Sequence, residues 1–406
     1  AYMNGDINIL TRRWASRPLT YDPVGTEEWL QTHNNKERNW KAVCEELAGH
    51  VMNVPISNIN IHLKFESLLK SDPIMDQRIN QTRLIMWQRY TVAAIMSPIF
   101  KKAKRRLKKA LKPNVIYTDG LRPDVLATLV RNYGDVNEFI ENDLEKQDRQ
   151  TDKDLIDIEF QMYRLLGVDD NVLSFWRSVH DLWKFKGATV RGTSKNMRLT
   201  GQATTSLGNV ITNLAVHSRF VSANRERISF ILMLGDDGLF AVKKGVSTTS
   251  LQETIKTHYN MMCTLTRNYK LGTFCRLLFV RTESGTVETV PDYIRLVNKF
   301  EISNAQNILD RNNMIMRLQS YIHMFGDTKW TRKLIERCDL DIKPLKWYNE
   351  SIAIEAGILK YGMSEIEIND NIQRFVRMAV ENKVYVKESK MWVSVFPKGR
   401  NKQLHW

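Results

Sequence analysis

The sequence Ile228-Ser-Phe-Ile-Leu-Met-Leu-Gly-Asp-Asp-Gly-Leu-Phe-Ala-Val242 contains two apolar runs separated by a turn signal. Six of its first seven residues are apolar, Gly-Asp-Asp-Gly favours a tight turn, and the apolar run resumes at Leu239. The pattern predicts a buried β-hairpin that carries Asp236 and Asp237 at its tip. Adjacent carboxylates repel each other unless a cation neutralises them, so the tip is a candidate Mg²⁺ site. A solvated turn uses the same residue types, and this alternative stays open.

Composition limits the class of protein. The chain has 406 residues, of which 43% are apolar, enough for one large core or two to three domains. Its formal charge of +15 favours a polyanionic partner, nucleic acid before membrane. The four cysteines are far apart and show no Cys-x-x-Cys spacing, so neither a zinc site nor a disulfide framework is indicated.

The sequence shows no targeting or membrane-spanning segment. No apolar run approaches the roughly eighteen residues that a transmembrane helix needs, and no signal peptide is recognisable at the start. The chain begins with Ala1 rather than Met, which suggests a piece of a longer polypeptide.

A dense basic run precedes Pro113. Residues Ile79–Ala110 have a mostly helical pattern with an expected break or kink at Pro98, and eight of the twelve residues in Lys101–Lys112 are Lys or Arg. Because such density repels itself, an anionic partner, above all phosphate, would be stabilising. A solvated basic helix or a localisation tract would also account for it.

Two other segments carry polar residues at structural transitions. Val136–Asp143 is predicted to be a short strand, and Asp143 and Asp148 straddle the change from this strand to a helix. Alone, Asp148 could also be a helix cap or a turn acid. Thr205 and Asn209, four residues apart, project from one face of a predicted helix, which could equally be a solvated polar face.

Gly201 is expected to give the loop before this helix its backbone freedom. A turn and a strand are predicted over Tyr269–Val280. Helices are predicted over Glu37–Leu47, Val168–Lys186, Ser250–Cys263 and most of the chain after about residue 286.

The order of these segments resembles a known family. Asp143-x₄-Asp148, then Gly201-x₃-Thr205-x₃-Asn209, then Gly235-Asp236-Asp237 are similar to motifs A, B and C of viral RNA-dependent RNA polymerases, most of all those of the alphavirus-like positive-strand RNA viruses. The resemblance implies a helix-rich α+β right-hand fold with fingers, a palm containing an antiparallel sheet, and a thumb.

The same resemblance implies a division of the chain. The expected parts are an N-terminal region with fingers at 1–135, palm with motif A at 136–166, a fingers insertion at 167–197, palm with motifs B to E at 198–285, and the thumb at 286–406.

The implied chemistry is nucleotidyl transfer, in which a 3′-hydroxyl attacks the α-phosphate of a nucleoside triphosphate. Asp143 and Asp236 would hold two Mg²⁺ ions, with Asp237 assisting and Mn²⁺ as an alternative metal. The family assigns Asp148, with Asn209 and Thr205, to the ribose 2′-hydroxyl.

The resemblance also extends to residues outside motifs A to C. Lys109, Lys112 and Arg122 occupy the place of the fingers motif that grips the triphosphate, and Lys270 that of a motif D lysine that protonates the leaving pyrophosphate. Phe274–Val280 is similar to motif E, the primer grip.

Expected partners are template and product RNA, nucleoside triphosphates and other viral replicase domains. The expected location is the host cytoplasm, at replication complexes.

Two departures from the family pattern stand out. Thr200-Gly201-Gln202 replaces a common Ser-Gly-Asp, and Arg149-Gln150-Thr151 follows Asp148 where relatives have Lys-Ser-Gln. The alternatives are a reverse transcriptase, which would carry an aromatic residue before Asp-Asp and a bulky residue at the 2′-hydroxyl gate, and a catalytically silent RNA-binding module.

Overall fold

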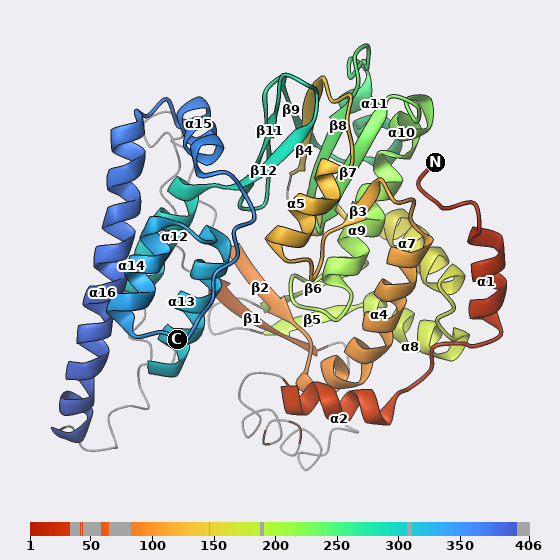
Figure 1. Ribbon diagram of the computed structural model, residues 1–406. Coiled ribbons are helices and arrows are strands. Elements are labelled where there is room, and N and C mark those ends of the chain that lie inside the picture. The colour runs from red at the N-terminus through yellow and green to blue at the C-terminus, as the bar shows by residue number, and fades with distance from the viewer. Residues whose placement is uncertain are drawn as a thin grey trace. The chain divides into compact units, whose positions relative to one another are not determined.

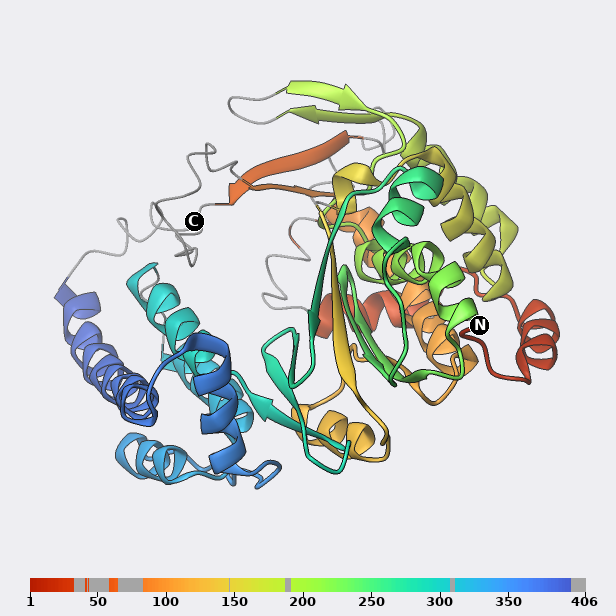
Figure 2. The same cartoon turned by 90° about the horizontal axis from the view of Figure 1, so that it is seen from above.

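A computed structural model describes residues 1–32, 58–64, 83–145, 147–186, 191–306 and 311–395, together with Lys41 and Val43. The chain forms two compact units, the first from 1–119 and 140–267 and the second from 120–139 and 268–406. Figures 1 and 2 show that helices and strands occur together. The helix-rich α+β class is therefore confirmed, while the five-part division into fingers, palm and thumb stays a prediction.

The first unit is built on a five-stranded sheet with the order β3-β7-β8-β4-β9. β3 pairs in parallel with β7, and β7 pairs antiparallel with β8. Only residues 140–144 of β4 belong to this unit. The strands are β3 (Val115–Tyr117), β7 (Ile228–Leu234), β8 (Asp237–Val242), β4 (Glu138–Leu144) and β9 (Cys263–Asn268).

The predicted hairpin is confirmed. Leu234 pairs with Asp237, which leaves a two-residue loop of Gly235 and Asp236. Gly235 has φ +62°, a left-handed value that glycine adopts without strain and that the first loop residue of a type II′ turn requires. Asp237 is the first residue of β8 rather than part of the loop.

A second sheet in this unit has the order β2-β1-β5-β6, and it corrects two helix predictions. The first part of the helix predicted over Ile79–Ala110 contains the strand β2 instead. The end of the helix predicted over Val168–Lys186 forms the strand β5. Both strands pair with β1, a long-range interaction that local periodicity does not reveal. The strands are β1 (Asn58–Lys64), β2 (Arg83–Trp87), β5 (Trp183–Lys186) and β6 (Arg191–Ser194).

Helices pack around these sheets in the first unit. The fully buried rings of Phe100, Tyr163 and Trp176 join three of them, because the Phe100 centroid is 4.9 Å from that of Tyr163 and 5.2 Å from that of Trp176. α4 continues through Pro98 without the expected break. The helices are α1 (Ile7–Ala15), α2 (Pro23–Thr32), α4 (Tyr90–Ala110), α6 (Gln147–Gln150), α7 (Lys153–Leu165), α8 (Asp170–Asp181), α9 (Thr205–Val216), α10 (Ser218–Ala223) and α11 (Leu251–Tyr259).

The second unit combines a three-stranded antiparallel sheet, order β10-β11-β12, with helices. Arg131 of α5 donates to the Glu288 carboxylate of β12 at 2.8 Å. The strands are β10 (Leu271–Phe274), β11 (Leu277–Arg281) and β12 (Val287–Pro291). The helices are α5 (Pro123–Arg131), α12 (Tyr293–Gln306), α13 (Arg311–Phe325), α14 (Lys329–Cys338), α15 (Glu350–Tyr361) and α16 (Glu365–Val395).

Most of the remaining predictions agree with the described residues. The region after about residue 286 is mainly helical apart from β12, and Tyr269–Val280 contains two strands rather than one. The helix expected over Glu37–Leu47 lies outside the described residues, apart from Lys41 and Val43. Within the described part of the chain, every helix is too short or too polar to span a bilayer.

Candidate active site

A row of polar side chains at four-residue spacing runs along α9. It consists of Thr205, Asn209, Asn213 and, at the residue that caps the helix, His217. Asn209 is 7% exposed, and Asn213 and His217 are fully buried. Buried polar groups are stable only when they are hydrogen-bonded, so each member of this polar row should have a partner in a neighbouring element.

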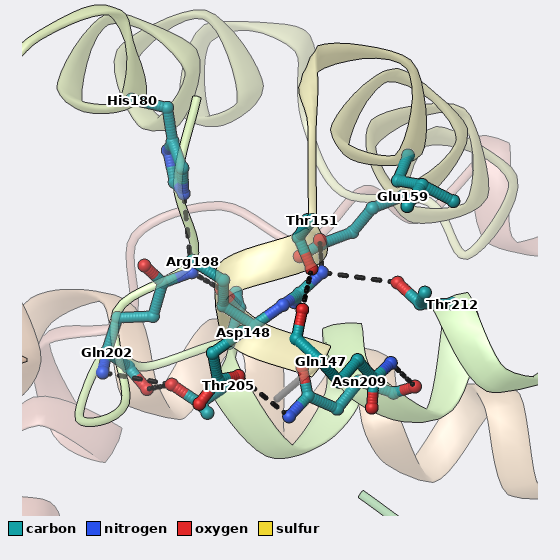
Figure 3. Close-up of polar contacts among 12 residues, drawn as sticks. Gln147, Asp148, Thr151, Glu159, His180, Arg198, Gln202, Thr205, Asn209 and Thr212 are labelled. Carbon is teal, nitrogen blue, oxygen red and sulfur yellow. Dashed lines mark hydrogen bonds and ion pairs between the residues drawn. The ribbon is translucent and has the colours of Figure 1, made fainter. Parts of the chain in front are cut away.

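Asn209 connects α9 to the segment that follows β4. Its Nδ2 donates to Asp148 Oδ1 at 3.0 Å, and Gln147 Nε2 donates to its backbone carbonyl at 2.9 Å. Figure 3 shows Asp148 of α6 and Asn209 of α9 facing each other. The structure thus brings together two residues that the motifs singled out, and the solvated-face alternative is wrong for Asn209 because its side chain is buried.

Asn213 fixes the tip of the hairpin. Its Nδ2 donates to the carbonyl oxygen of Asp236 at 3.0 Å and lies 3.5 Å from that of Gly235. A side chain of α9 therefore holds the backbone of the loop that carries Asp236.

His217 lies against both β4 and β8. Its Nδ1–H donates to the Asn213 carbonyl at 2.7 Å, so Nε2 is left to accept from Asn142 Nδ2. Its ring centroid is 5.0 Å from that of Phe240. Burial lowers the pKa of His217 to about 4, which keeps the ring neutral near pH 7.

These contacts define the relative direction of β4 and β8. Going along α9 from Asn213 to His217, the helix passes from the hairpin tip to Phe240, so it follows β8. His217, near the end of α9, contacts Asn142, whereas Asn209, nearer its start, contacts Asp148, which comes later in the chain than Asn142. The helix α9 therefore runs opposite to β4. The two neighbouring strands are therefore antiparallel, and the end of β4 lies close to the start of β8.

The alternation of side chains places two acids on the same face of this sheet. Asn142 of β4 and Phe240 of β8 face His217 of α9. Side chains alternate between the two faces of a sheet, so Asp143, one residue from Asn142, and Asp237, three residues from Phe240, face away from α9. Asp143, Asp236 and Asp237 are all exposed. Among the described residues, no three His, Cys, Asp or Glu side chains are close enough to hold a metal ion together.

Gly201 and Thr205 close the loop that leads into α9. The Gly201 N–H donates to the Met86 carbonyl at 2.8 Å, and a Cβ at this position would lie only 2.9 Å from Trp87 Cβ. Gly201 has no positive φ, so close approach to β2, rather than the expected backbone freedom, requires glycine here. The Thr205 hydroxyl donates to the Leu199 carbonyl at 2.6 Å and accepts from the Gln202 N–H at 3.0 Å.

Gln202, which departs from the expected Ser-Gly-Asp pattern, is held inside the loop before α9. Its Nε2 donates to Thr204 Oγ1 at 2.7 Å, and its Oε1 accepts from the Leu199 N–H at 3.2 Å. The amide is 7% exposed and stabilises the loop from inside.

A buried ion pair beneath this site was missed by the sequence analysis. Arg198 donates to Glu159 Oε2 at 2.6 Å and to Thr212 Oγ1 at 3.3 Å, and the Arg198 and Glu159 side chains are 1% and 3% exposed (Figure 3). Gly208 makes room for this pair, because a Cβ there would lie 1.6 Å from Arg198 Nη1. The pair therefore joins α7, the loop before α9 and α9 itself.

The other predicted site residues lie elsewhere. Lys109 is exposed near the end of α4, and the Lys112 N–H donates to the Tyr2 carbonyl at 2.9 Å. Arg122 and Lys270 belong to the second unit, where Arg122 pairs with Asp124 at 2.6 Å and Lys270 with Glu355 at 2.7 Å.

Carboxylates at the ends of neighbouring strands are also found in the two-metal sites of phosphatases, nucleases and polymerases, so this geometry alone does not select one class. Residues 7–332 match the profile of the family described as RNA dependent RNA polymerase. The chain belongs to this family.

Individual relatives are viral proteins. The chain is 21% identical to the replicase large subunit of Tobacco rattle virus (isolate PpK20) over 70% of its own length and 17% of that protein. For the RNA-directed RNA polymerase 2a of Tobacco streak virus (strain WC), the identity is 22% over 88% of this chain and 44% of the relative. The chain thus spans less than half of each, and the resemblance indicated by motifs A to C is confirmed.

Removing one member of the buried ion pair should destabilise the protein strongly. We expect Glu159→Leu or Arg198→Met to lower the free energy of unfolding by about 3–5 kcal/mol, because each leaves an uncompensated buried charge, and the double variant to recover much of that loss. Urea unfolding followed by circular dichroism would measure the cycle. As a control, Arg164→Gln breaks an exposed ion pair with Asp170 and should change the free energy of unfolding by less than about 1 kcal/mol. If the losses caused by the two single variants at Arg198 and Glu159 simply added in the double variant, the assigned coupling would be wrong.

The buried His217 should make stability depend on pH. Its pKa of about 4 in the folded state lies below the ordinary value of 6.5, so the unfolded chain binds a proton more readily between these values. The free energy of unfolding should fall, by at most about 3 kcal/mol from this group, as the pH drops from 6.5 to 4. Across this pH range, the free energy of unfolding should depend less steeply on pH in His217→Gln than in the control His258→Gln, which changes an exposed histidine. Equal slopes in the two variants would refute the interpretation.

Proposed function

We propose that this chain is a polymerase domain that synthesises RNA on an RNA template, extending a 3′-hydroxyl with nucleotides from nucleoside triphosphates. The observation that carries the proposal is the contact of Asp148 with Asn209, next to the exposed acids of β4 and the hairpin tip. Membership of the RNA dependent RNA polymerase family supports the same reaction. The right-hand layout, with the five segments expected from the sequence, is part of the proposal.

Asp143 and Asp236, assisted by Asp237, are proposed to hold divalent cations. All three donors are carboxylate oxygens, which suit hard cations such as Mg²⁺ or Mn²⁺. Bringing three carboxylates together costs electrostatic repulsion, which a bound cation would offset. When bound, a pair of such ions stabilises the attacking and leaving oxygens of phosphoryl transfer. The role of α9 is to fix the hairpin backbone through Asn213 before substrate arrives.

Asp148 and Asn209 are proposed to recognise the ribose 2′-hydroxyl. The Asp148 carboxylate can accept a hydrogen bond, and the Asn209 amide can both donate and accept. Among the described residues, nothing donates to Asn209 Oδ1, which leaves an acceptor for this hydroxyl. Thr205 contributes indirectly, because its hydroxyl is used to close the loop around Gly201.

The remaining roles follow the family alone. Lys270 is proposed to protonate the leaving pyrophosphate, and Lys109, Lys112 and Arg122 to contact the triphosphate. The proposed setting is a replication complex in the host cytoplasm, with other replicase domains.

A primer-extension assay distinguishes the alternatives. Extension with ribonucleotides on an RNA template supports the proposal, extension with deoxyribonucleotides supports a reverse transcriptase, and RNA binding without synthesis supports a silent module.

Asp236→Asn should abolish synthesis. The substitution removes a proposed metal ligand from the hairpin tip, and we expect a loss of at least roughly 10³-fold, since metal stabilisation of the transition state is worth several kcal/mol. Thermal unfolding should be nearly unchanged, because Asp236 is exposed. The charge-matched control is Asp154→Asn on the exposed face of α7. Near-normal incorporation by Asp236→Asn would remove this residue from the site.

Asn209→Ala should weaken the preference for ribonucleotides. Loss of one hydrogen bond to the 2′-hydroxyl is worth about 1–1.5 kcal/mol, so the ratio of kcat/KM for ribo- over deoxyribonucleotides should fall roughly tenfold. Single-nucleotide incorporation measures this ratio, with Asn224→Ala as an amide control on another helix end. An unchanged ratio in active Asn209→Ala would exclude the assigned role.

A further inference from the structure

The described part of the first unit has a cavity between α1 and α4. A cavity of about 250 Å³ is lined there by Arg13, Arg17, Arg105, Arg106 and Lys109, with Trp14 on one wall. Figures 1 and 2 show α1 at the edge of this unit, and the residues that line the cavity belong to α1, the segment after it and α4 rather than to β4, α9 or the β7–β8 hairpin. The α1–α4 cavity is therefore separate from the candidate active site.

The walls of the cavity are braced by hydrogen bonds. Arg106 donates to the Leu166 carbonyl at 2.8 Å and to the Arg17 carbonyl at 2.7 Å, which fastens the chain after α1 and the end of α7 to α4. Its guanidinium also lies 5.7 Å from the ring centroid of Trp14, which is buried. A ligand would thus meet a preformed surface and would lose less entropy on binding.

The charges around α4 are distributed unevenly. One turn before Arg105 and Arg106, Lys102 pairs with Asp22 at 2.6 Å, and Lys104 pairs with Asp119 at 2.8 Å. The described residues that line the α1–α4 cavity include no acid, and within the described chain no ion pair involves Arg13, Arg105 or Lys109. Five neighbouring cations repel one another, so an anion that enters the cavity relieves this repulsion.

We propose that the α1–α4 cavity binds the phosphate backbone of RNA at a site outside the catalytic centre. Four of the five cations are arginines, whose planar forks match phosphate oxygens in pairs. The cations come from two segments, so a polynucleotide with successive phosphates can contact more of them at once than a single phosphate ion can. The identity of the polyanion as RNA rests on the proposed function, but the charge argument does not.

For Lys109, this assignment replaces the triphosphate contact proposed above with a contact to an RNA phosphate. It also accounts for part of the basic run Lys101–Lys112: some of its residues are neutralised by acids, and those that face α1 form the cavity.

The test compares two double variants that each remove one exposed cation from α1 and one from α4. Arg13→Gln/Arg105→Gln changes the cavity, whereas Arg12→Gln/Lys101→Gln changes neighbouring positions that do not line it. Both are made on Asp236→Asn, so that binding is measured without synthesis. Fluorescence anisotropy with a 5′-labelled single-stranded RNA, from 50 to 200 mM salt, gives the affinity and its salt dependence.

We expect the cavity variant to bind RNA roughly tenfold more weakly or worse. Its slope of log affinity against log salt should fall by about 1.4, because each phosphate that a cation no longer neutralises lowers the slope by about 0.7. The control should change little in either quantity. Equal affinities and slopes for the two variants would overturn the proposal, whatever the outcome of the synthesis assays.

Two further measurements separate other anions from RNA. If the cavity variant raised KM for nucleoside triphosphates, measured with an intact Asp236, but kept its RNA affinity, the site would belong to free nucleotide and the proposal would be wrong. Loss of binding to phosphatidylserine vesicles with unchanged RNA affinity would reject it in favour of a membrane surface.

Discussion

The structure of the candidate site depends on one buried row of hydrogen bonds along α9. Asn209 holds the segment after β4, Asn213 holds the hairpin loop, and His217 holds β4 through Asn142. These groups are buried, so breaking any of the bonds would leave a polar atom without a partner, at a cost of about 1–3 kcal/mol. The need to satisfy one helix face therefore sets the relative positions of acids that are distant in the sequence.

The ion pair of Arg198 and Glu159 supports this arrangement from below. A buried pair adds little net stability compared with apolar side chains, but it is specific about geometry, since each charge must meet its partner. Arg198 occupies the space that Gly208 leaves open, one residue before Asn209. The ion pair therefore couples the loop before α9, α9 and α7, which suits the recognition of a hydroxyl that is proposed for Asp148 and Asn209.

Part of the site was predictable because its signals are local. The hairpin follows from its apolar runs and glycines, and the polar row of α9 could have been found by extending the spacing of Thr205 and Asn209 to Asn213 and His217. By contrast, Arg198 and Glu159 are 39 residues apart, and nothing local to either indicates the other. The strands β2 and β5 were taken for helix because their partner is β1, distant from both in the sequence.

The sequence by itself determined the family, the order of the three motifs and the residue types of the candidate site. It did so because turn residues, apolar periodicity and short polar spacings act over a few neighbouring residues. Only the tertiary structure decided that Asp148 meets Asn209, that Gly201 is needed for close approach to β2, and that basic residues of α4 divide between acidic partners and an open cavity. These outcomes depend on which buried polar and charged groups find a partner, and burial is a property of the whole fold.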